Sequence, residues 1–249
     1  MCGLLGYAAA GELDTDRFYH AIAALSHRGP DGRGESVRQG VALGHTRLSI
    51  IDLEGGAQPL RSECGRYVLV ANGEIYNHLE LRAELHSAGA KFLTGSDCEV
   101  ILQGYAVWGR AVLERLEGMY AFALHDTETQ EVLLARDPLG MKPLYLTAAG
   151  EGVRFASELK ALLTLMPSTP DLCATALVQY VEGQHPLARS TPFKTVERVL
   201  AGEAVLIRAG RIEGRWRHWQ VSEVVPFREE QPVAALDKLM ETVFTQHQR

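Results

Sequence analysis

The sequence lacks a basic cluster, a long apolar run and a recognisable targeting segment. Its 25 Lys and Arg residues are scattered among 31 Asp and Glu residues, and the formal net charge is −6. Nucleic-acid binders carry a basic patch, and a membrane-spanning helix needs about 18 or more consecutive apolar residues. The start of the chain also lacks the basic and apolar regions of a secretory signal. We therefore expect a cytoplasmic protein with no nucleic-acid or membrane partner.

Cysteine is scarce as well, with four residues and no Cys-x-x-Cys pair. Zinc sites and disulfide frameworks need cysteines at short or regular spacings, so we expect reduced thiols and no metal site. Three of the cysteines are predicted to be small core or surface residues: Cys64, Cys98 and Cys173. Cys2 differs from them because it directly follows the initiator methionine.

What the sequence does contain is enough apolar residues, 46%, to bury a core. Short β-rich runs that end in Gly, Pro, Asn or Asp predict strands at 2–9, 41–52, 66–77, 119–126, 131–137, 142–148 and 152–158. Apolar residues at three- and four-residue spacing predict helices around 18–25, 81–88 and 100–108. Strands in hairpins with helices between them favour an α+β sandwich over a doubly wound parallel sheet.

The texture changes after Leu163, where prolines interrupt the pattern. A helical run near 177–181 and a hairpin over 199–214 are predicted next. Residues 227–232 resemble a linker, and 233–244 predict one amphipathic helix. An isolated helix with an apolar face needs a surface to pack on, such as a further domain or a second copy in a homodimer.

Cys2 is the first candidate for chemistry. Removal of Met1, which a small second residue favours, would give Cys2 a free α-amine beside its thiol. An α-amine titrates at about 7.7–8.0, so near neutral pH a fraction of it can accept the thiol proton. This is the arrangement of an N-terminal nucleophile, although a cysteine at position two also occurs without any catalytic role.

Asn72 and Gly73, at the predicted end of a strand, offer an oxyanion hole for such a nucleophile. Asn72 supplies a side-chain amide, and the backbone N–H of Gly73 can approach a ligand because no Cβ is in the way. The alternative interpretation is a two-residue hairpin turn, for which Asn-Gly is typical.

Seven motifs occur in one order: CGLLG (2–6), HRGPDGRG (27–34), LGHTRLSIID (43–52), NGEIYNH (72–78), SDCEVIL (96–102), RDPLGMKPLY (136–145) and FASELKALL (155–163). Together they resemble the class II glutamine amidotransferase domain of the glutamine-hydrolysing asparagine synthetase family. The resemblance covers residues 2–219 and implies a four-layer αββα sandwich of the Ntn-hydrolase type. It also implies that Cys2 is the nucleophile and that Asn72 and Gly73 form the oxyanion hole.

The resemblance further implies a set of glutamine-binding residues. These are Arg47 for the α-carboxylate, Glu74 and Asp97 for the α-ammonium, and the backbone of Ile50 and Ile51 along the pocket, together with Asn72 and Gly73. A guanidinium fork suits a carboxylate. Taken singly, the charged residues have other readings: a surface charge for Arg47, a turn residue for Glu74 and a helix N-cap for Asp97.

Two of the motifs are predicted to support the site. The HRGPDG motif is either a turn loop or a loop that closes over glutamine, with Arg28 and Gly29 near the site. RDPLGMKPLY is predicted to be structural or to form part of a tunnel, because no side chain in it has to ionise for the chemistry.

The implied activity is hydrolysis of glutamine to glutamate and ammonia through a Cys2 thioester. The ammonia would pass to an ATP-dependent synthetase domain or subunit. No SGGxDS phosphate loop occurs in the chain, so residues 220–249 are expected to be a linker and the start of an absent synthetase domain. ATP and Mg²⁺ would belong to that domain, and this chain would need no cofactor. Two alternatives stay open: an Ntn amidase that acts on another amide, and a catalytically silent structural domain.

Overall fold

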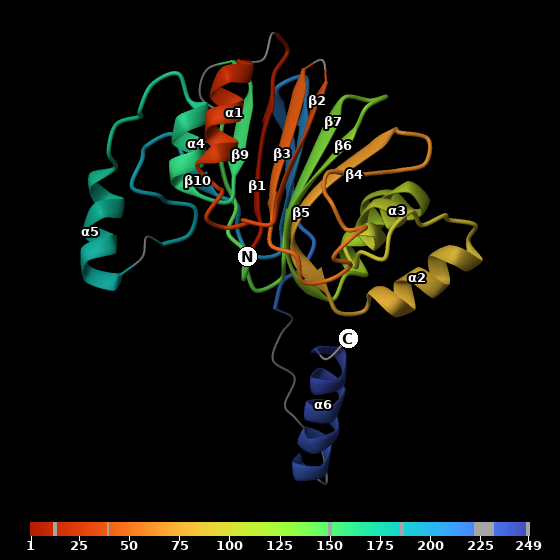
Figure 1. The fold of residues 1–249 in the computed structure, drawn as a ribbon. Helices are drawn as coiled ribbons and strands as arrows, with labels where there is room; N and C mark the ends of the chain where they lie inside the picture. The colour runs from red at the N-terminus through yellow and green to blue at the C-terminus, as the bar shows by residue number, and fades with distance from the viewer. Residues whose placement is uncertain (12–13, 39, 149–150, 185–186, 222–231, 248–249) are drawn as a thin grey trace.

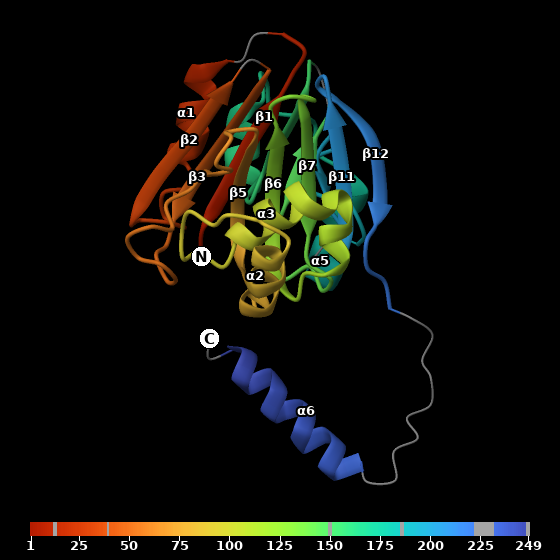
Figure 2. The same ribbon diagram turned by 90° about the vertical axis from the view of Figure 1, so that its right-hand side faces the viewer.

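The computed structural model describes residues 1–11, 14–38, 40–148, 151–184, 187–221 and 232–247. In these ranges two six-stranded antiparallel sheets lie face to face, and helices cover both outer faces (Figures 1 and 2). Buried apolar side chains form one cluster between the sheets and one on each outer side. The predicted four-layer αββα sandwich is therefore confirmed. No described helix has the length and apolar character that crossing a membrane requires.

The first sheet has the strand order β10-β8-β9-β1-β3-β2. Its strands are β1 (Gly3–Ala8), β2 (Gly32–Arg38), β3 (Val41–Arg47), β8 (Tyr145–Thr147), β9 (Val153–Ala156) and β10 (Glu197–Arg198). Helices α1 (Thr15–Ala23) and α4 (Leu159–Leu165) pack on its outer face through an apolar cluster that includes Phe18 and Leu162. Helix α5 (Ala174–Gly183) lies to the side in Figure 1 and buries only Ala176.

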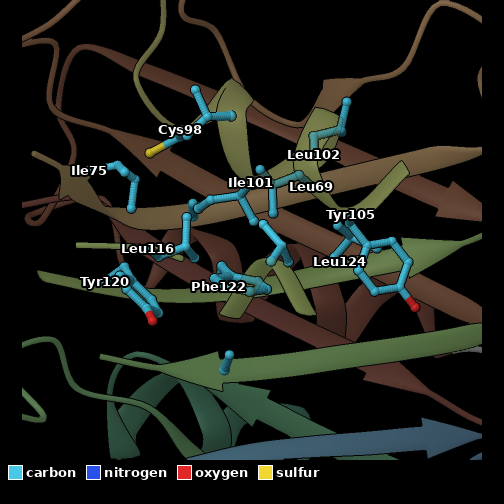
Figure 3. Close-up of a cluster of buried hydrophobic side chains, with 14 of the residues drawn as sticks. Leu69, Ile75, Cys98, Ile101, Leu102, Tyr105, Leu116, Tyr120, Phe122 and Leu124 are labelled. Atoms are coloured by element: carbon cyan, nitrogen blue, oxygen red, sulfur yellow. The ribbon is translucent and has the colours of Figure 1, made fainter. Parts of the chain in front are cut away.

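The second sheet has the order β12-β11-β7-β6-β5-β4. Its strands are β4 (Leu60–Arg61), β5 (Tyr67–Ile75), β6 (Gly118–Asp126), β7 (Glu131–Arg136), β11 (Glu203–Arg208) and β12 (Arg211–Arg217). Helices α2 (His78–Ser87) and α3 (Glu99–Trp108) and the 3₁₀ helix η1 (Gly109–Glu114) cover its outer face. Figure 3 shows Ile101 of α3 close to Leu69 of β5 in this outer cluster.

Alternation along the strands produces the layers. On β5, Val68 and Val70 belong to the cluster between the sheets, whereas Leu69 and Ala71 belong to the outer cluster. Successive side chains of a strand point to opposite faces, so both faces of this strand are covered. By the same period, Asn72 and Glu74 point toward the space between the sheets.

The structure corrects the interpretation of Asn72-Gly73 as a possible hairpin turn. Strand β5 continues through both residues to Ile75 and pairs with β6 along its whole length. Gly73 is needed because a Cβ there would lie 2.4 Å from the carbonyl oxygen of Met119 on β6. The close approach that excludes a side chain therefore comes from the neighbouring strand.

The C-terminal helix that the sequence predicts is α6 (Pro232–His247). Its large apolar side chains are exposed in the described structure, among them Leu236, Leu239 and Phe244. The predicted linker at 227–232 falls outside the described residues except for Pro232.

Candidate functional site

A pocket of about 320 Å³ opens at the end of the sandwich where β1 begins and β3 ends. Every site residue that the sequence nominated lines it: Cys2, Arg47, Ile50, Ile51, Asn72, Gly73, Glu74 and Asp97. The antiparallel pairing of β1 with β3 brings the first and last residues of these strands together. The pocket thus draws on both sheets and on the loops that follow β3 and precede α3.

The Cys2 thiol is held by the backbone of Leu48. The N–H of Leu48 donates to Sγ at 3.4 Å, and the thiol donates to the Leu48 carbonyl oxygen at 3.6 Å. The buried Arg28 side chain donates from Nε to the Cys2 carbonyl at 2.9 Å and from Nη1 to Glu158 at 2.9 Å. Sulfur and backbone of Cys2 are therefore fixed from two directions.

The edge of β5 that faces away from β6 presents its N–H groups toward the pocket. The N–H of Ala71 donates to Gln58 Oε1 at 2.6 Å, and the N–H of Ile75 donates to Asp97 Oδ2 at 2.8 Å. Hydrogen bonding alternates along antiparallel strands, so Gly73, midway between them, directs its N–H to the same edge. This N–H is therefore not used in pairing with β6.

Asn72 provides a second donor. It is buried, with 2% of its surface exposed, and its side-chain Nδ2 has no hydrogen-bond partner among the described residues. The great majority of buried side-chain polar atoms have a partner, so this amide is a marked exception. Asn72 and Gly73 are adjacent, and both line the pocket that contains Cys2.

His45 connects the two sheets behind this edge. Its Nε2 donates to the Ala71 carbonyl at 3.0 Å, which assigns the proton to Nε2 and leaves the buried Nδ1 without a partner in the described chain. Burial lowers the pKa of His45, the Ala71 hydrogen bond opposes this, and the nearby Arg47 charge adds to the lowering, so that the pKa is about 4. The imidazole is therefore neutral at neutral pH.

Arg47 leaves β3 and holds the loop that follows it. Nη1 donates to the Leu53 carbonyl at 3.1 Å, and Nη2 donates to the carbonyls of Ile51 at 3.2 Å and Asp52 at 2.5 Å. A guanidinium has five N–H donors, so two remain that the described residues do not engage. These two donors are available for a carboxylate in the pocket.

Two carboxylates, Asp97 and Glu74, lie on another wall of the pocket. Burial raises the pKa of Asp97, although hydrogen bonds from the backbone of Ile75 and Cys98 oppose this effect. The N-cap of α3 is Cys98, and Asp97 bonds to Ile75 on β5, so the interpretation of Asp97 as that helix's N-cap is wrong. In the described structure Glu74 has no ion pair, which leaves this wall suited to a cation.

Sequence reasoning missed several pocket residues, among them Leu48, Gln58, Met119 and Lys142. Cys98, predicted to be an ordinary core residue, is buried in the pocket wall, and burial raises its thiol pKa well above the usual value. Nothing in the local sequence pattern distinguishes Gln58, because its importance lies in a contact with a strand 13 positions away.

The loop after β7, which carries the RDPLGMKPLY motif, is fastened by charged groups. The buried Asp137 carboxylate accepts the N–H groups of Leu139 at 3.1 Å, Met141 at 2.9 Å and Lys142 at 3.0 Å. Arg136 donates to the carbonyls of Lys142 and Val199 at 2.6 Å and to that of Gly140 at 2.5 Å. The motif therefore builds a rigid loop that brings Lys142 to the pocket.

The HRGPDG motif contributes Arg28 to the surroundings of Cys2, while Gly32 and Gly34 already belong to β2. Elsewhere in the described ranges, no group of three or more His, Cys, Asp or Glu side chains is placed to hold a metal ion.

Comparison with protein families gives a match to the glutamine amidotransferase domain over residues 1–219. A Mycobacterium tuberculosis protein named as a glutamine-hydrolysing asparagine synthetase is 42% identical over 233 residues, covering 85% of this chain and 36% of that protein. Asparagine synthetase 1 of Bacillus subtilis is 38% identical over 213 residues, covering 84% of this chain and 34% of its own. This chain spans about a third of the length of these curated relatives.

Solved structures share the fold. The B. subtilis glutamine phosphoribosylpyrophosphate amidotransferase, complexed with ADP and GMP, is 24% identical with a TM-score of 0.65, covering 88% of this chain and 50% of that one. A structure described as the allosteric regulatory enzyme of purine biosynthesis has the same identity and coverage and a TM-score of 0.66. Both agree with two antiparallel sheets flanked by helices.

Proposed function

Because the chain belongs to the class II glutamine amidotransferase domain family related to the glutamine-hydrolysing asparagine synthetases, we propose that it hydrolyses glutamine to glutamate and ammonia. The observation that carries the proposal is the unpartnered donor Asn72 Nδ2, beside the Gly73 N–H that points away from β6, in the pocket that contains the Cys2 thiol. Donors fixed where negative charge develops are what attack on an amide carbonyl requires.

In the first half of the proposed reaction, the α-amine of Cys2, freed by removal of Met1, accepts the thiol proton. The thiolate then attacks the δ-carbon of glutamine, and the oxyanion is stabilised by Asn72 and Gly73. When the tetrahedral intermediate collapses, the C–N bond breaks, the leaving nitrogen takes the proton from the α-ammonium of Cys2, and ammonia departs.

In the second half, water attacks the γ-glutamyl thioester while the α-amine accepts one of its protons. The C–S bond breaks, and the products are glutamate and the restored thiol. These steps balance without a metal ion or an organic cofactor. We expect the reaction in the cytoplasm, where reducing conditions keep Cys2 a thiol.

Substrate recognition in this proposal divides along the charges of the pocket. The two free donors of Arg47 would bind the α-carboxylate, and Glu74 with Asp97 would bind the α-ammonium, while the backbone of Ile50 and Ile51 lines the path between them. Because the asparagine synthetase relatives are about three times as long as this chain, we propose that an ATP-dependent synthetase domain or subunit takes up the ammonia.

The test is a glutaminase assay on protein whose intact mass shows that Met1 has been removed. We expect ammonia release from the wild type and a loss of at least about 10⁴-fold in Cys2→Ala, because burial raises the pKa of the other pocket thiol, Cys98, and so disfavours its thiolate. A diazo-ketone analogue of glutamine should label Cys2, as peptide mass mapping will show. Cys64→Ser, which removes an exposed thiol outside the pocket, should be labelled and active like the wild type.

Three results would contradict the proposal. Ammonia release that persists in Cys2→Ala would exclude the thioester. Labelling of Cys98 instead of Cys2 would show that the analogue binds in the pocket but that Cys2 is not the nucleophile. Activity on a different amide, with none on glutamine, would favour an amidase of other specificity.

A further inference from the structure

The pocket is bordered by two loops, residues 48–57 after β3 and residues 92–97 before α3, and one side chain joins them. The Asp52 carboxylate accepts the N–H of Gly55 through Oδ1 at 3.0 Å and the N–H of Gly95 through Oδ2 at 2.8 Å. The first bond lies within its own loop, and the second crosses to the other. We call this pair of hydrogen bonds the Asp52 latch.

The backbone of Asp52 is specialised for this arrangement. Its φ is +49°, in the left-handed region that few residues other than glycine adopt and in which Asp and Asn are enriched. The glycines around it leave little space: a Cβ on Gly55 would lie 2.7 Å from Asp52 Oδ2, and one on Gly56 would lie 2.7 Å from Arg47 Nη2. The close packing on both sides indicates that the loop is built around the latch.

On one side, the latch is continuous with Arg47. The carbonyls of Ile51, Asp52 and Leu53 accept three hydrogen bonds from the guanidinium. The N–H of Gly56 closes the turn onto the Asp52 carbonyl at 2.9 Å. Because three bonds fasten the guanidinium to this loop, a movement of the loop carries Arg47 with it.

On the other side, the latch is continuous with Asp97. The 92–97 loop is bound to α2 by Arg82, whose Nη1 and Nη2 donate to the carbonyls of Thr94 and Ser96 at 3.0 Å each. It is bound to α3 by Glu99, whose carboxylate accepts the N–H groups of Leu93 and Thr94 at 2.7 and 2.8 Å. Gly95, the partner of Asp52, stands two residues before Asp97.

We infer that Asp52 is a positioning residue that sets the separation between Arg47 and Asp97. It thereby makes the pocket select a substrate that carries both a carboxylate and an ammonium group on its α-carbon. The inference rests on the proposed glutaminase function. Glutamine carries its carboxylate and ammonium on one carbon, so both groups must meet their partners at a fixed spacing. An amide with only the carboxylate can follow Arg47 if the loop shifts.

The experiment compares Asp52→Gly with the wild type on glutamine and on glutaramate, which has the same amide and carboxylate but no α-ammonium. Glycine accepts the positive φ without strain, so this change removes only the carboxylate. We expect KM for glutamine to rise about tenfold, as for the loss of a charge-assisted hydrogen bond, with kcat within about twofold. KM for glutaramate should change less than about threefold.

Glu54→Gln is the matched control, because Glu54 is an exposed acid of the same loop and is not among the hydrogen-bond partners of Arg47, which are the carbonyls of Ile51, Asp52 and Leu53. It removes one negative charge without touching the latch, and both KM values should stay at wild-type level. Asp52→Asn keeps the shape and one acceptor oxygen, so its KM for glutamine should lie between those of wild type and Asp52→Gly. Amide hydrogen exchange should quicken in both loops of Asp52→Gly, independently of turnover.

The outcomes separate the two hypotheses. An inactive wild type, with Met1 removed, would overturn the proposed function and with it the inference. An active wild type and an unchanged KM for glutamine in Asp52→Gly would overturn the inference alone. Equal losses on glutamine and glutaramate, or a fall in kcat without a change in KM, would show a general disturbance of the pocket and would also overturn it.

Discussion

Two polar regions, one beside the pocket and one in its wall, use their hydrogen-bonding groups in opposite ways. In the loop after β7, Asp137 accepts three backbone N–H groups and Arg136 donates to three backbone carbonyls. On the pocket edge of β5, the side-chain Nδ2 of Asn72 has no partner in the described chain, and the Gly73 N–H points away from β6. A buried donor without a partner lowers stability. The β7 loop is therefore arranged to stabilise the fold, and the β5 edge is arranged to receive a ligand.

The largest effect that would test this contrast is expected from Asp137→Ala. The substitution leaves three backbone N–H groups without their acceptor and removes the negative charge near the buried Arg136, so we expect the free energy of unfolding to fall by about 3–5 kcal/mol. Denaturant titration followed by circular dichroism measures it. Asp171→Ala, which removes an exposed ion pair with Lys194, should change stability by less than about 1 kcal/mol. Equal losses in the two variants would break the contrast.

The next effect concerns Asn72. Asn72→Ala removes one oxyanion donor, so we expect kcat for ammonia release to fall by about 10²–10³-fold. Because the amide has no partner to lose, the free energy of unfolding should stay within about 1 kcal/mol of the wild type. Steady-state kinetics and denaturant titration on the same preparation measure both quantities.

Asn77 supplies the matched control for Asn72. Its side-chain amide donates to the Arg115 carbonyl at 2.9 Å and accepts the Glu117 N–H at 3.1 Å, outside the pocket. Asn77→Ala should therefore lower stability by about 1 kcal/mol and leave kcat unchanged. If Asn72→Ala loses stability and Asn77→Ala loses activity, the division between the two kinds of polar group is wrong.

The last prediction concerns the pH dependence of stability that His45 causes. This residue supports the β5 edge from behind through its bond to the Ala71 carbonyl. Its pKa is about 4 in the folded state and 6.5 in the unfolded state, so between these values the unfolded state binds more protons. Stability is therefore lost as the pH falls from 6.5 toward 4, by about 1.4 kcal/mol per pH unit and about 3 kcal/mol in all for this residue.

His45→Gln keeps a donor for the Ala71 carbonyl and removes the titration. The slope of the free energy of unfolding against pH should fall by about 1.4 kcal/mol per unit between pH 6 and 4.5. His125, whose pKa burial also lowers to about 4, remains in the variant and accounts for part of the residual slope. Unchanged slopes would show that His45 is protonated in the folded protein.

Much of the fold could be predicted from the sequence because buried strands and amphipathic helices leave periodic patterns. Each of the seven strand runs contains a strand of the structure, from β1 to β9, and the three helical patterns correspond to α1, α2 and α3. Strand β2 was not predicted because only Ser36 of its seven residues is buried, so the strand has no apolar alternation. An edge strand of this kind is recognisable only from its pairing with β3.

The candidate site could be nominated from motifs, but its internal contacts could not. The turn preference of Asn72-Gly73 is a local property, and pairing with Ala121 and Tyr120 of β6 overrides it. The bond from Ile75 to Asp97, and the bonds from Arg47 to the carbonyls of its own loop, depend on tertiary placement. The roles of Arg47, Glu74 and Asp97 toward glutamine stay predictions.

Gln58 occupies the hydrogen-bonding groups at the edge of the second sheet next to β4. Its side-chain amide accepts from the Ala71 N–H at 2.6 Å and donates to the Ala71 carbonyl at 3.1 Å, which are the two bonds that a residue of an adjoining strand would make. A strand edge with unpaired N–H and C=O groups allows another chain to add a strand and so promotes self-association. The Gln58 side chain blocks that route just before β4 begins at Leu60, while the N–H of Gly73 on the same edge faces the pocket.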